Sequence, residues 1–324
     1  MKAMLVHELG GLDKLTLSEI PAPKAGKGQV RIAIHTAGCN FADTLMISGV
    51  YQNKPPRPFV PGLEAAGTVI ECGPDTAGFE PGDRVLAWLN SGGYAQEAVA
   101  QATDVFAIPD GMDFVTAAGF PIAYSTALVS LAHHRVDLQL GEVLLVHGAA
   151  GGVGLAAVEV GKAMGATVVG TVGSDDKRDI VSARGADHVI NYSTQSIRDR
   201  VKALVGGADV VYDPVGGDAF MQSLRCINTN GRLAIIGFAS GTIPQIPANY
   251  LLVKNISAIG IAVGAYRSVD PVFFAACFKR LMAWHEAGKL HPLVSHTFAL
   301  DQTAAALDML ITRKATGKVV VTMG

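Results

Sequence analysis

Seven residues from Gly148 to Gly154, with the sequence GAAGGVG, have the composition of a turn that binds phosphate. They follow a short β-branched apolar run over 143–147 and precede the amphipathic run LAAVEVGKAM. Small residues let the backbone approach a phosphate, and the free N–H groups of a helix start face its charge. This order predicts a dinucleotide site, with a tight turn and no ligand as the alternative. The predicted contacts are Ala149, Gly151, Gly152, Val153 and Gly154.

The end of the next apolar run, TVVGTV (167–172), bears on which dinucleotide would bind. Gly173 and Ser174 follow it, where a carboxylate normally binds the ribose hydroxyls of NAD. A serine hydroxyl with nearby positive charge suits the 2′-phosphate of NADP, and Lys177 and Arg178 come next. We therefore predict NADPH. The two aspartates between them weaken this prediction, and the basic pair could instead belong to a solvated helix face.

Alternating apolar and amphipathic segments predict an α/β architecture with a doubly wound, parallel, six-stranded sheet. The expected strands are 143–147, 167–172, 188–191, 209–213, 232–237 and 256–261. The expected helical segments between them are 153–164, 175–184, 195–205 and 217–227. The stretch from Tyr250 to Ala265 contains Lys254 and Asn255, so we expect buried strands there and no membrane span.

The first third of the chain has short β-rich runs separated by glycine and proline, which predicts a mostly antiparallel, barrel-like β-domain. The tail adds SHTFAL and KVVVTM after two helical segments. Because six strands already complete the parallel sheet, we expect the tail to return to the first domain. The predicted division is 1–123 with 264–324 as the β-domain, and 124–263 as the nucleotide-binding domain.

The composition excludes several classes of function. The net charge is −2 and no basic run occurs, so no nucleic-acid partner is expected. No long uncharged apolar stretch or secretory leader is found, and we expect a cytoplasmic protein with no membrane partner. The four cysteines lack C-x-x-C spacing, so neither a disulfide framework nor a cysteine-built zinc site is expected.

The chain resembles the zinc-independent quinone oxidoreductase (zeta-crystallin-like) branch of the medium-chain dehydrogenase/reductase superfamily over essentially its whole length. The motifs that carry the resemblance are GCNFADTLMISGVY, PFVPGLEAAGTV, EPGDRV, VHGAAGGVGLAAVEVGKAMGA, GADHVINY, VYDPVGG and GKVVV. The resemblance implies a GroES-like domain, a Rossmann domain and a bound NADPH. It also implies an oligomer, and we expect a homodimer paired through the edge strand 256–261.

Zinc-dependent relatives carry a cysteine in the loop that corresponds to residues 38–43, and Gly-His-Glu where this chain has Gly62-Leu63-Glu64. Asn40 stands at the cysteine position, although Cys39 is its neighbour. Leu63 cannot ligate a metal. The resemblance therefore implies no metal.

Hydride transfer without a Lewis acid favours an acceptor that is already activated, such as a quinone or an α,β-unsaturated carbonyl compound. The predicted catalytic residues are Asn40 for its amide, Asp43 as its orienting neighbour, and Tyr51 for its phenol. Alternatively, Asn40 and Asp43 only cap a helix, and Tyr51 only packs. By resemblance, the further cofactor contacts are Thr126, Tyr192, Phe238, Ser240, Val263 and Lys318.

The predicted function is NADPH-dependent reduction of quinones or enones, by hydride or by single electrons. Two alternatives remain. One is reduction of an enoyl thioester, and the other is a non-catalytic NADPH-binding protein with a crystallin-like or sensing role.

Overall fold

A computed structural model describes all 324 residues. The chain forms two compact units. Unit 1 comprises Met1–Ile122 and Pro292–Gly324, and unit 2 comprises Ala123–His291. No helix in either unit combines the length and the apolar character that crossing a bilayer requires.

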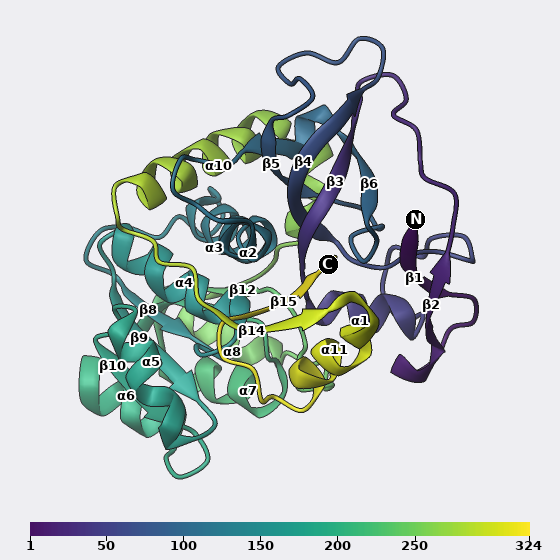
Figure 1. Ribbon diagram of the computed structural model, residues 1–324. Helices are drawn as coiled ribbons and strands as arrows, with labels where there is room; N and C mark the ends of the chain where they lie inside the picture. The colour runs from purple at the N-terminus through teal and green to yellow at the C-terminus, as the bar shows by residue number, and fades with distance from the viewer. The chain divides into compact units, whose positions relative to one another are not determined.

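Unit 2 is built on a six-stranded sheet, drawn in teal and green in Figure 1. Across the sheet its strands are β10 (His188–Asn191), β9 (Thr167–Val172), β8 (Val143–Val146), β11 (Ala208–Asp213), β12 (Ile227–Ile235) and β13 (Ser257–Gly260). All neighbouring strands are parallel. The strand order reverses at β8, which creates the switch point where ligands bind in such sheets. The predicted doubly wound sheet is confirmed.

Helices connect and cover these strands. They are α3 (Pro121–Ala132), α4 (Gly152–Ala163), α5 (Arg178–Ala183), α6 (Ile197–Val205), α7 (Gly217–Cys226), α8 (Ala248–Lys254), α9 (Tyr266–Val269) and α10 (Pro271–Glu286), with 3-10 turns η3 (Asp175–Lys177) and η4 (Val263–Ala265). Phe220 and Leu224 of α7 pack with Val211 and Leu233 of the sheet in one fully buried cluster. The apolar side of α7 therefore fixes one face of the sheet.

Residues 250–254 are helical and belong to α8, so the prediction of buried strands from Tyr250 onward is wrong for them. A short apolar run does not distinguish a strand from a helix by periodicity alone. Asn255, with φ of 52°, ends this helix in the left-handed conformation. Leu252 and Val253 are 78% and 79% exposed, so they do not contribute to the core.

Unit 1 contains a two-stranded antiparallel sheet of β1 (Lys2–Val6) and β2 (Leu15–Glu19). Its larger sheet has the order β14 (Val294–Ala299), β15 (Lys318–Thr322), β3 (Gln29–Gly38), β4 (Glu64–Cys72), β5 (Arg84–Trp88) and β7 (Val105–Ala107), and β6 (Glu97–Gln101) also pairs with β3. Only β14 and β15 are parallel neighbours. The mostly antiparallel domain is confirmed.

The C-terminal segment belongs to unit 1, where the yellow strand β15 pairs with the purple strand β3 (Figure 1). The remaining elements of unit 1 are α1 (Phe41–Ile47), α2 (Phe114–Ala118), α11 (Thr303–Ile311), η1 (Leu12–Lys14), η2 (Ala102–Asp104) and η5 (Leu300–Gln302). The N-terminal helix α1 packs against α11 near the C-terminus. The first and last segments of the chain thus form one body.

Residues 264–291 lie in unit 2, whereas the sequence placed the return to the first domain at residue 264. The contacts at the end of α3 explain this placement. Tyr266 and Phe273 pack edge-on to His133, with ring centroids 5.1 and 6.0 Å away. The Tyr266 hydroxyl also lies 2.9 Å from His133 Nε2. This aromatic cluster joins α9 and α10 to α3.

Glu159 of α4 is a buried carboxylate that holds three segments of unit 2 together. Its Oε2 accepts hydrogen bonds from the Tyr124 hydroxyl at 2.6 Å and the His291 N–H at 3.0 Å. Its Oε1 accepts from Arg184 Nη1 at 3.2 Å. Tyr124 lies near the first residue of unit 2 and His291 is its last, so one carboxylate holds both ends of this segment.

We predict that Glu159→Gln lowers the free energy of unfolding by about 1–3 kcal/mol. The substitution keeps the size of the side chain but removes the charge that faces Arg184. The loss should stay below that of a fully buried pair because the Arg184 side chain is 21% exposed. Chemical denaturation measures the change. Glu8→Gln, in the exposed Glu8–Lys14 pair, is the control, and an equal loss in both variants would contradict this role.

Candidate active site

The turn after β8 has the backbone geometry that phosphate binding requires. Gly148 is left-handed, with φ of +58°, and α4 begins at Gly152. A Cβ on Gly154 would lie 2.1 Å from the carbonyl oxygen of Gly148, so only glycine fits there. The first N–H groups of α4 have no acceptor within the helix. The structure therefore brings the predicted residues 149–154 into one turn whose free donors can face an anion.

His147 directly precedes this turn and is fully buried. Its Nδ1 lies 3.1 Å from Thr171 Oγ1 and its Nε2 lies 2.6 Å from Ser223 Oγ. Because the Ser223 hydroxyl donates to the Ala219 carbonyl, the hydrogen-bond pattern assigns the imidazole proton to Nε2. Burial lowers the pKa of His147, which keeps the ring neutral. The ring links β8, β9 and α7 beside the turn.

Residues at the ends of β9 and β10 are brought together. A Cβ on Gly173 would lie 2.7 Å from the Tyr192 hydroxyl, so the tyrosine ring covers this backbone closely. Ser174 is the N-cap residue of η3, and Lys177 ends that turn. Arg178 forms an exposed ion pair with its neighbour Asp175 at 3.5 Å. Gly173, Ser174 and Tyr192 therefore lie at one end of the sheet.

The loops after β11 and β12 are bonded to each other. The N–H groups of Ala239 and Ser240 donate to the carbonyls of Pro214 and Val215, both at 3.0 Å. The Phe238 ring would lie 3.2 Å from a Cβ on Gly216. These contacts place the predicted residues Phe238 and Ser240 over the end of β11.

The side chain of Asp213 shapes this loop. Its Oδ1 accepts hydrogen bonds from the N–H groups of Val215 at 2.8 Å and Gly216 at 2.9 Å. Asp213 is 1% exposed and was not among the predicted site residues. The only signal for it was its place in the VYDPVGG motif.

Two further predicted residues, Thr126 and Val263, also belong to unit 2. Thr126 is 8% exposed on α3, and Val263 is 5% exposed at the start of η4, after β13. Because the sheet is parallel, the residues that follow β8, β9, β10, β12 and β13 all occupy its carboxyl edge.

Asn40 and Asp43 of unit 1 form the cap of α1. Asn40 is the N-cap residue, and its N–H donates to Asp43 Oδ2 at 2.8 Å. The Tyr94 hydroxyl donates to the same oxygen at 2.7 Å. Oδ1 of Asp43 has no hydrogen-bond partner in the chain. The Asp43 carboxylate therefore caps the N-terminus of α1 by accepting from the Asn40 N–H.

Burial raises the pKa of Asp43 from its ordinary value of 3.8 to about 7. The hydrogen bonds from Tyr94 and Asn40 and the charge of Lys318 oppose this rise, and the charge of Glu64 adds to it. The unpartnered Oδ1 is the oxygen that can carry the proton. Near neutral pH this carboxyl group thus exists in both protonation states.

Lys318 extends from β15 into the same cluster and is 6% exposed. Its Nζ donates to the Cys39 carbonyl at 2.8 Å, to Asn40 Oδ1 at 2.8 Å and to Glu64 Oε1 at 2.7 Å. An ammonium has three protons, and these three acceptors use all of them. The structure thus brings Lys318 together with Asn40 in unit 1.

Glu64 begins β4 and is fully buried. Its Oε1 also accepts from Asn40 Nδ2 at 2.8 Å, and its Oε2 accepts from the Ile122 N–H at 2.7 Å. Glu64 and Tyr94 were not predicted as site residues. Glu64 was visible only as the remnant of the Gly-Leu-Glu triplet, and nothing in the sequence distinguished Tyr94.

Tyr51 and Cys39 lie beside this cluster. Tyr51 is partly buried, and its pKa is raised by burial and by the charge of Asp43. Cys39 is 2% exposed, and burial followed by the charge of Asp43 raises the pKa of its thiol to about 12. Burial therefore favours the neutral form of this thiol.

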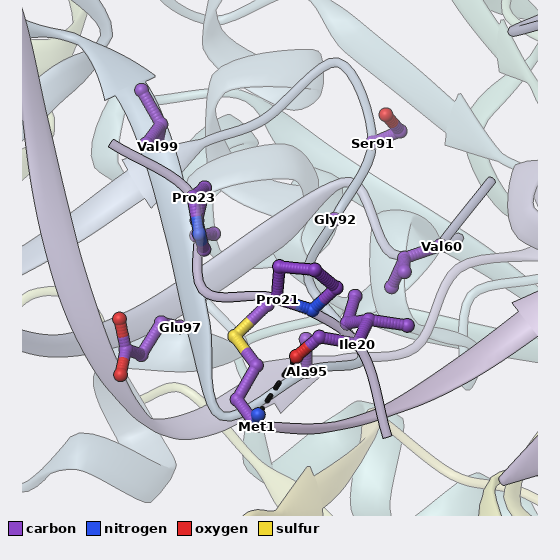
Figure 2. Close-up of a pocket in the computed structure, with 11 residues that line it drawn as sticks. Met1, Ile20, Pro21, Pro23, Val60, Ser91, Gly92, Ala95, Glu97 and Val99 are labelled. Atoms are coloured by element: carbon purple, nitrogen blue, oxygen red, sulfur yellow. Dashed lines mark hydrogen bonds between the residues drawn. The ribbon is translucent and has the colours of Figure 1, made fainter. Parts of the chain in front are cut away.

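A separate cavity of about 200 Å³ lies in unit 1, between the N-terminus and β6. Figure 2 shows its lining, which includes Met1, Ile20, Pro21 and Glu97, with the Met1 amine donating to the Ile20 carbonyl at 2.8 Å. None of the predicted site residues lines it. This cavity is therefore distinct from the predicted site residues.

Comparison with known proteins identifies the family of the chain. A family model described as an alcohol dehydrogenase GroES-like domain matches residues 26–110, and one described as a zinc-binding dehydrogenase matches residues 152–278. The "Quinone oxidoreductase-like protein 2 homolog" of Nematostella vectensis is 42% identical over 325 residues, covering 99% of this chain and 88% of the relative. The chain belongs to the quinone oxidoreductase family of the medium-chain dehydrogenase/reductase superfamily.

Solved structures of quinone oxidoreductases have the same fold. The enzyme of Pseudomonas syringae is 29% identical with a TM-score of 0.93, and 99% of each chain is covered. The enzyme of Thermus thermophilus, solved also in complex with NADPH, is 32% identical with a TM-score of 0.88, and 100% of each chain is covered. The family resemblance and the GroES-like plus Rossmann fold predicted from the sequence are thus confirmed.

We predict that Asp43→Asn removes a pH dependence of stability from this member of the family. Because the pKa of Asp43 is raised from 3.8 to about 7 in the fold, the folded state holds this proton more tightly than the unfolded chain. The stabilising contribution is complete below about pH 4 and is lost as the pH rises through about 7. Across this window the unmodified chain should lose up to about 1.4 kcal/mol per pH unit relative to Asp43→Asn.

Urea denaturation at a series of pH values measures this difference. Asp13→Asn, which changes an exposed carboxylate on η1, is the control and should leave the curve unchanged. Parallel curves for the unmodified chain and Asp43→Asn would show that the carboxyl group is ionised throughout.

Proposed function

We propose that this quinone oxidoreductase family member is an NADPH-dependent reductase of quinones or α,β-unsaturated carbonyl compounds that works without a metal ion. The observation that carries the proposal is the presence, in one chain, of a glycine turn that leads into the start of α4 and of a buried Lys318–Glu64–Asn40 cluster. The turn offers backbone N–H groups to the phosphates of the cofactor, and the cluster offers the remaining side-chain N–H of Asn40 to an acceptor.

The residues of unit 2 fit NADPH. Glycine at position 154 lets the start of α4 pack against the Gly148 carbonyl, and the unbonded N–H groups of this helix start can bind a pyrophosphate. Ser174 follows β9 where a carboxylate would repel a 2′-phosphate, and Lys177 lies three residues further on. The related enzyme of Thermus thermophilus is described in complex with NADPH. We assign the same cofactor to this chain, with Tyr192, Phe238 and Ser240 as further contacts.

When bound, NADPH supplies a hydride to an electron-poor carbon of the acceptor. The negative charge would then be carried through the conjugated system to the carbonyl oxygen of the acceptor, which would take a proton from water or a nearby hydroxyl. Asn40 has one side-chain N–H beyond the one it donates to Glu64, and this N–H can donate to that oxygen. Tyr51 offers a phenolic O–H beside it. Hydrogen bonds that strengthen as negative charge develops lower the barrier.

The donor chemistry of unit 1 supports a mechanism without metal. Leu63 has no ligating atom, and no group of three or more histidine, cysteine, aspartate or glutamate side chains is placed to hold a metal ion. The amide oxygen of Asn40 already accepts from the Lys318 ammonium. The Glu64 carboxylate is already paired with this ammonium, so a divalent cation at this place would be repelled by Lys318 and would compete with it for Glu64.

We further propose a homodimer as the assembled form. β13 is the last strand of its sheet, so one of its edges is unpaired within the chain. Leu252 and Val253 of the preceding helix are 78% and 79% exposed. Pairing of two β13 edges would satisfy the backbone groups and cover apolar surface.

Steady-state oxidation of NADPH against a panel of acceptors tests the proposed function. The panel should contain ortho- and para-quinones, short enones, and an enoyl thioester of coenzyme A. We expect turnover with quinones or enones that is unchanged after dialysis against a chelator. Turnover restricted to the thioester would assign the chain to enoyl-thioester reduction. Tight NADPH binding with no turnover on any acceptor would contradict the proposal and indicate a non-catalytic binding protein.

We predict that Lys177→Ala weakens NADPH binding about tenfold and leaves NADH binding unchanged, because only NADPH carries the 2′-phosphate. Titration of cofactor fluorescence measures both affinities. Lys14→Ala, which removes an exposed lysine of unit 1, is the control. An equal loss for both cofactors would show that Lys177 does not recognise the phosphate.

A further inference from the structure

Lys318 is a buried cation whose three hydrogen bonds all end on residues of unit 1. Its side chain packs against Gly119, where an added Cβ would lie 3.2 Å from Lys318 Cβ and Cγ. The aliphatic part of the Lys318 side chain is therefore closely packed, in addition to the hydrogen bonds of its ammonium. A phosphate contact would require Lys318 to leave acceptors that are themselves buried, which disfavours a role in binding the cofactor.

Glu64 supplies the counter-charge, and the fold makes room for it. A Cβ on Gly38 would lie 2.3 Å from Glu64 Oε1, so the carboxylate occupies space that only glycine leaves free. Its other oxygen accepts from the Ile122 N–H at the start of α3. Each carboxylate oxygen thus has a fixed donor, and the ion pair is satisfied on all sides.

The Asn40 carboxamide lies within this ion pair. Its oxygen accepts from the Lys318 ammonium, and its nitrogen donates one proton to Glu64. Because Lys318 can only donate and the Glu64 carboxylate can only accept, these two bonds fix the orientation of the carboxamide. A cation on the oxygen draws electron density from the amide nitrogen, which makes the remaining N–H a stronger donor. That N–H is the group assigned above to the acceptor oxygen.

We propose that Lys318 is a positioning residue for the reductase reaction. Its ammonium, together with the Glu64 carboxylate, orients and polarises the Asn40 carboxamide so that the free N–H stabilises the negative charge that develops on the acceptor oxygen. This inference rests on the proposed function, and it assigns Lys318 to the side of the acceptor and not to the cofactor.

The experiment compares Lys318→Met, Lys318→Met/Glu64→Gln and Asn40→Ala with the unmodified enzyme. Lys318→Met alone leaves a buried carboxylate without its counter-charge and can impair folding. The double variant removes both charges at nearly constant volume, so it is the variant on which the test depends. Lys162→Met is the control, because this lysine pairs with Asp187 in unit 2 and is partly exposed.

We expect the double variant to keep its affinity for NADPH and to lose about 10- to 100-fold in kcat, with Lys162→Met unchanged in both. In the Asn40→Ala background the same double substitution should cause no further loss, because the group it positions is absent. A full additional loss in that background would overturn the proposal. So would weaker NADPH binding with unchanged kcat, which would make Lys318 a cofactor contact.

A second readout does not depend on turnover. The side-chain amide signals of Asn40, assigned by their absence in Asn40→Ala, are recorded by NMR in the free protein. They should shift in the double variant and stay unchanged in Lys162→Met. Unchanged Asn40 signals in the double variant would overturn the proposal. If the unmodified protein reduces no acceptor, the proposed function fails, while these signals still decide whether Lys318 polarises Asn40.

Discussion

Burying the Lys318 ammonium is the constraint on which the architecture of unit 1 depends. A buried charge is tolerated only when it is paired and its protons are bound, and here a carbonyl, an amide and a carboxylate meet that demand. The partners come from the end of β3, the start of α1 and the start of β4, while Lys318 itself begins β15. Glu64 and Lys318 are 254 residues apart in the chain. The cluster therefore cannot form until the C-terminal strand has paired with β3, which couples the site to the completion of the fold.

Unit 2 uses buried polar groups in the same way beside the cofactor turn. His147 is neutral and bonded to Thr171 and Ser223, so the last residue before the turn is held from both the neighbouring strand and a covering helix. Asp213 holds the loop after β11 by accepting from two successive backbone N–H groups. In both places a short polar contact inside the sheet determines where a functional loop leaves the core. These contacts hold the backbone beside the turn and the loop in one arrangement, which pre-organises it.

Local features were predictable from the sequence, and long-range ones were not. The strand, glycine turn and helix at 143–164 lie within one continuous segment, and the alternation of strands and helices after them predicted the fold of unit 2. The run at Tyr250 was misassigned because its stop signal, a left-handed Asn255, is weaker than a glycine or proline. Asn40 and Asp43 could be named as candidate site residues because they lie in the same short segment of the sequence. The partners that define their chemistry, Glu64, Tyr94 and Lys318, are brought to them only by the pairing of distant strands.

The composition of the Lys318 cluster also bears on which acceptors the chain can reduce. The ammonium and the Glu64 carboxylate lie 2.7 Å apart, so their fields largely cancel at longer range. The proposed contribution that remains is directional, namely the second side-chain N–H of Asn40, and a hydrogen bond supplies less stabilisation than a metal cation with open coordination. Such a site suits acceptors whose own conjugation already spreads the incoming charge, as quinones and enones do. Under the proposed function, an unactivated ketone would need stronger stabilisation of its oxygen, and Leu63 offers no ligand for an ion that would provide it.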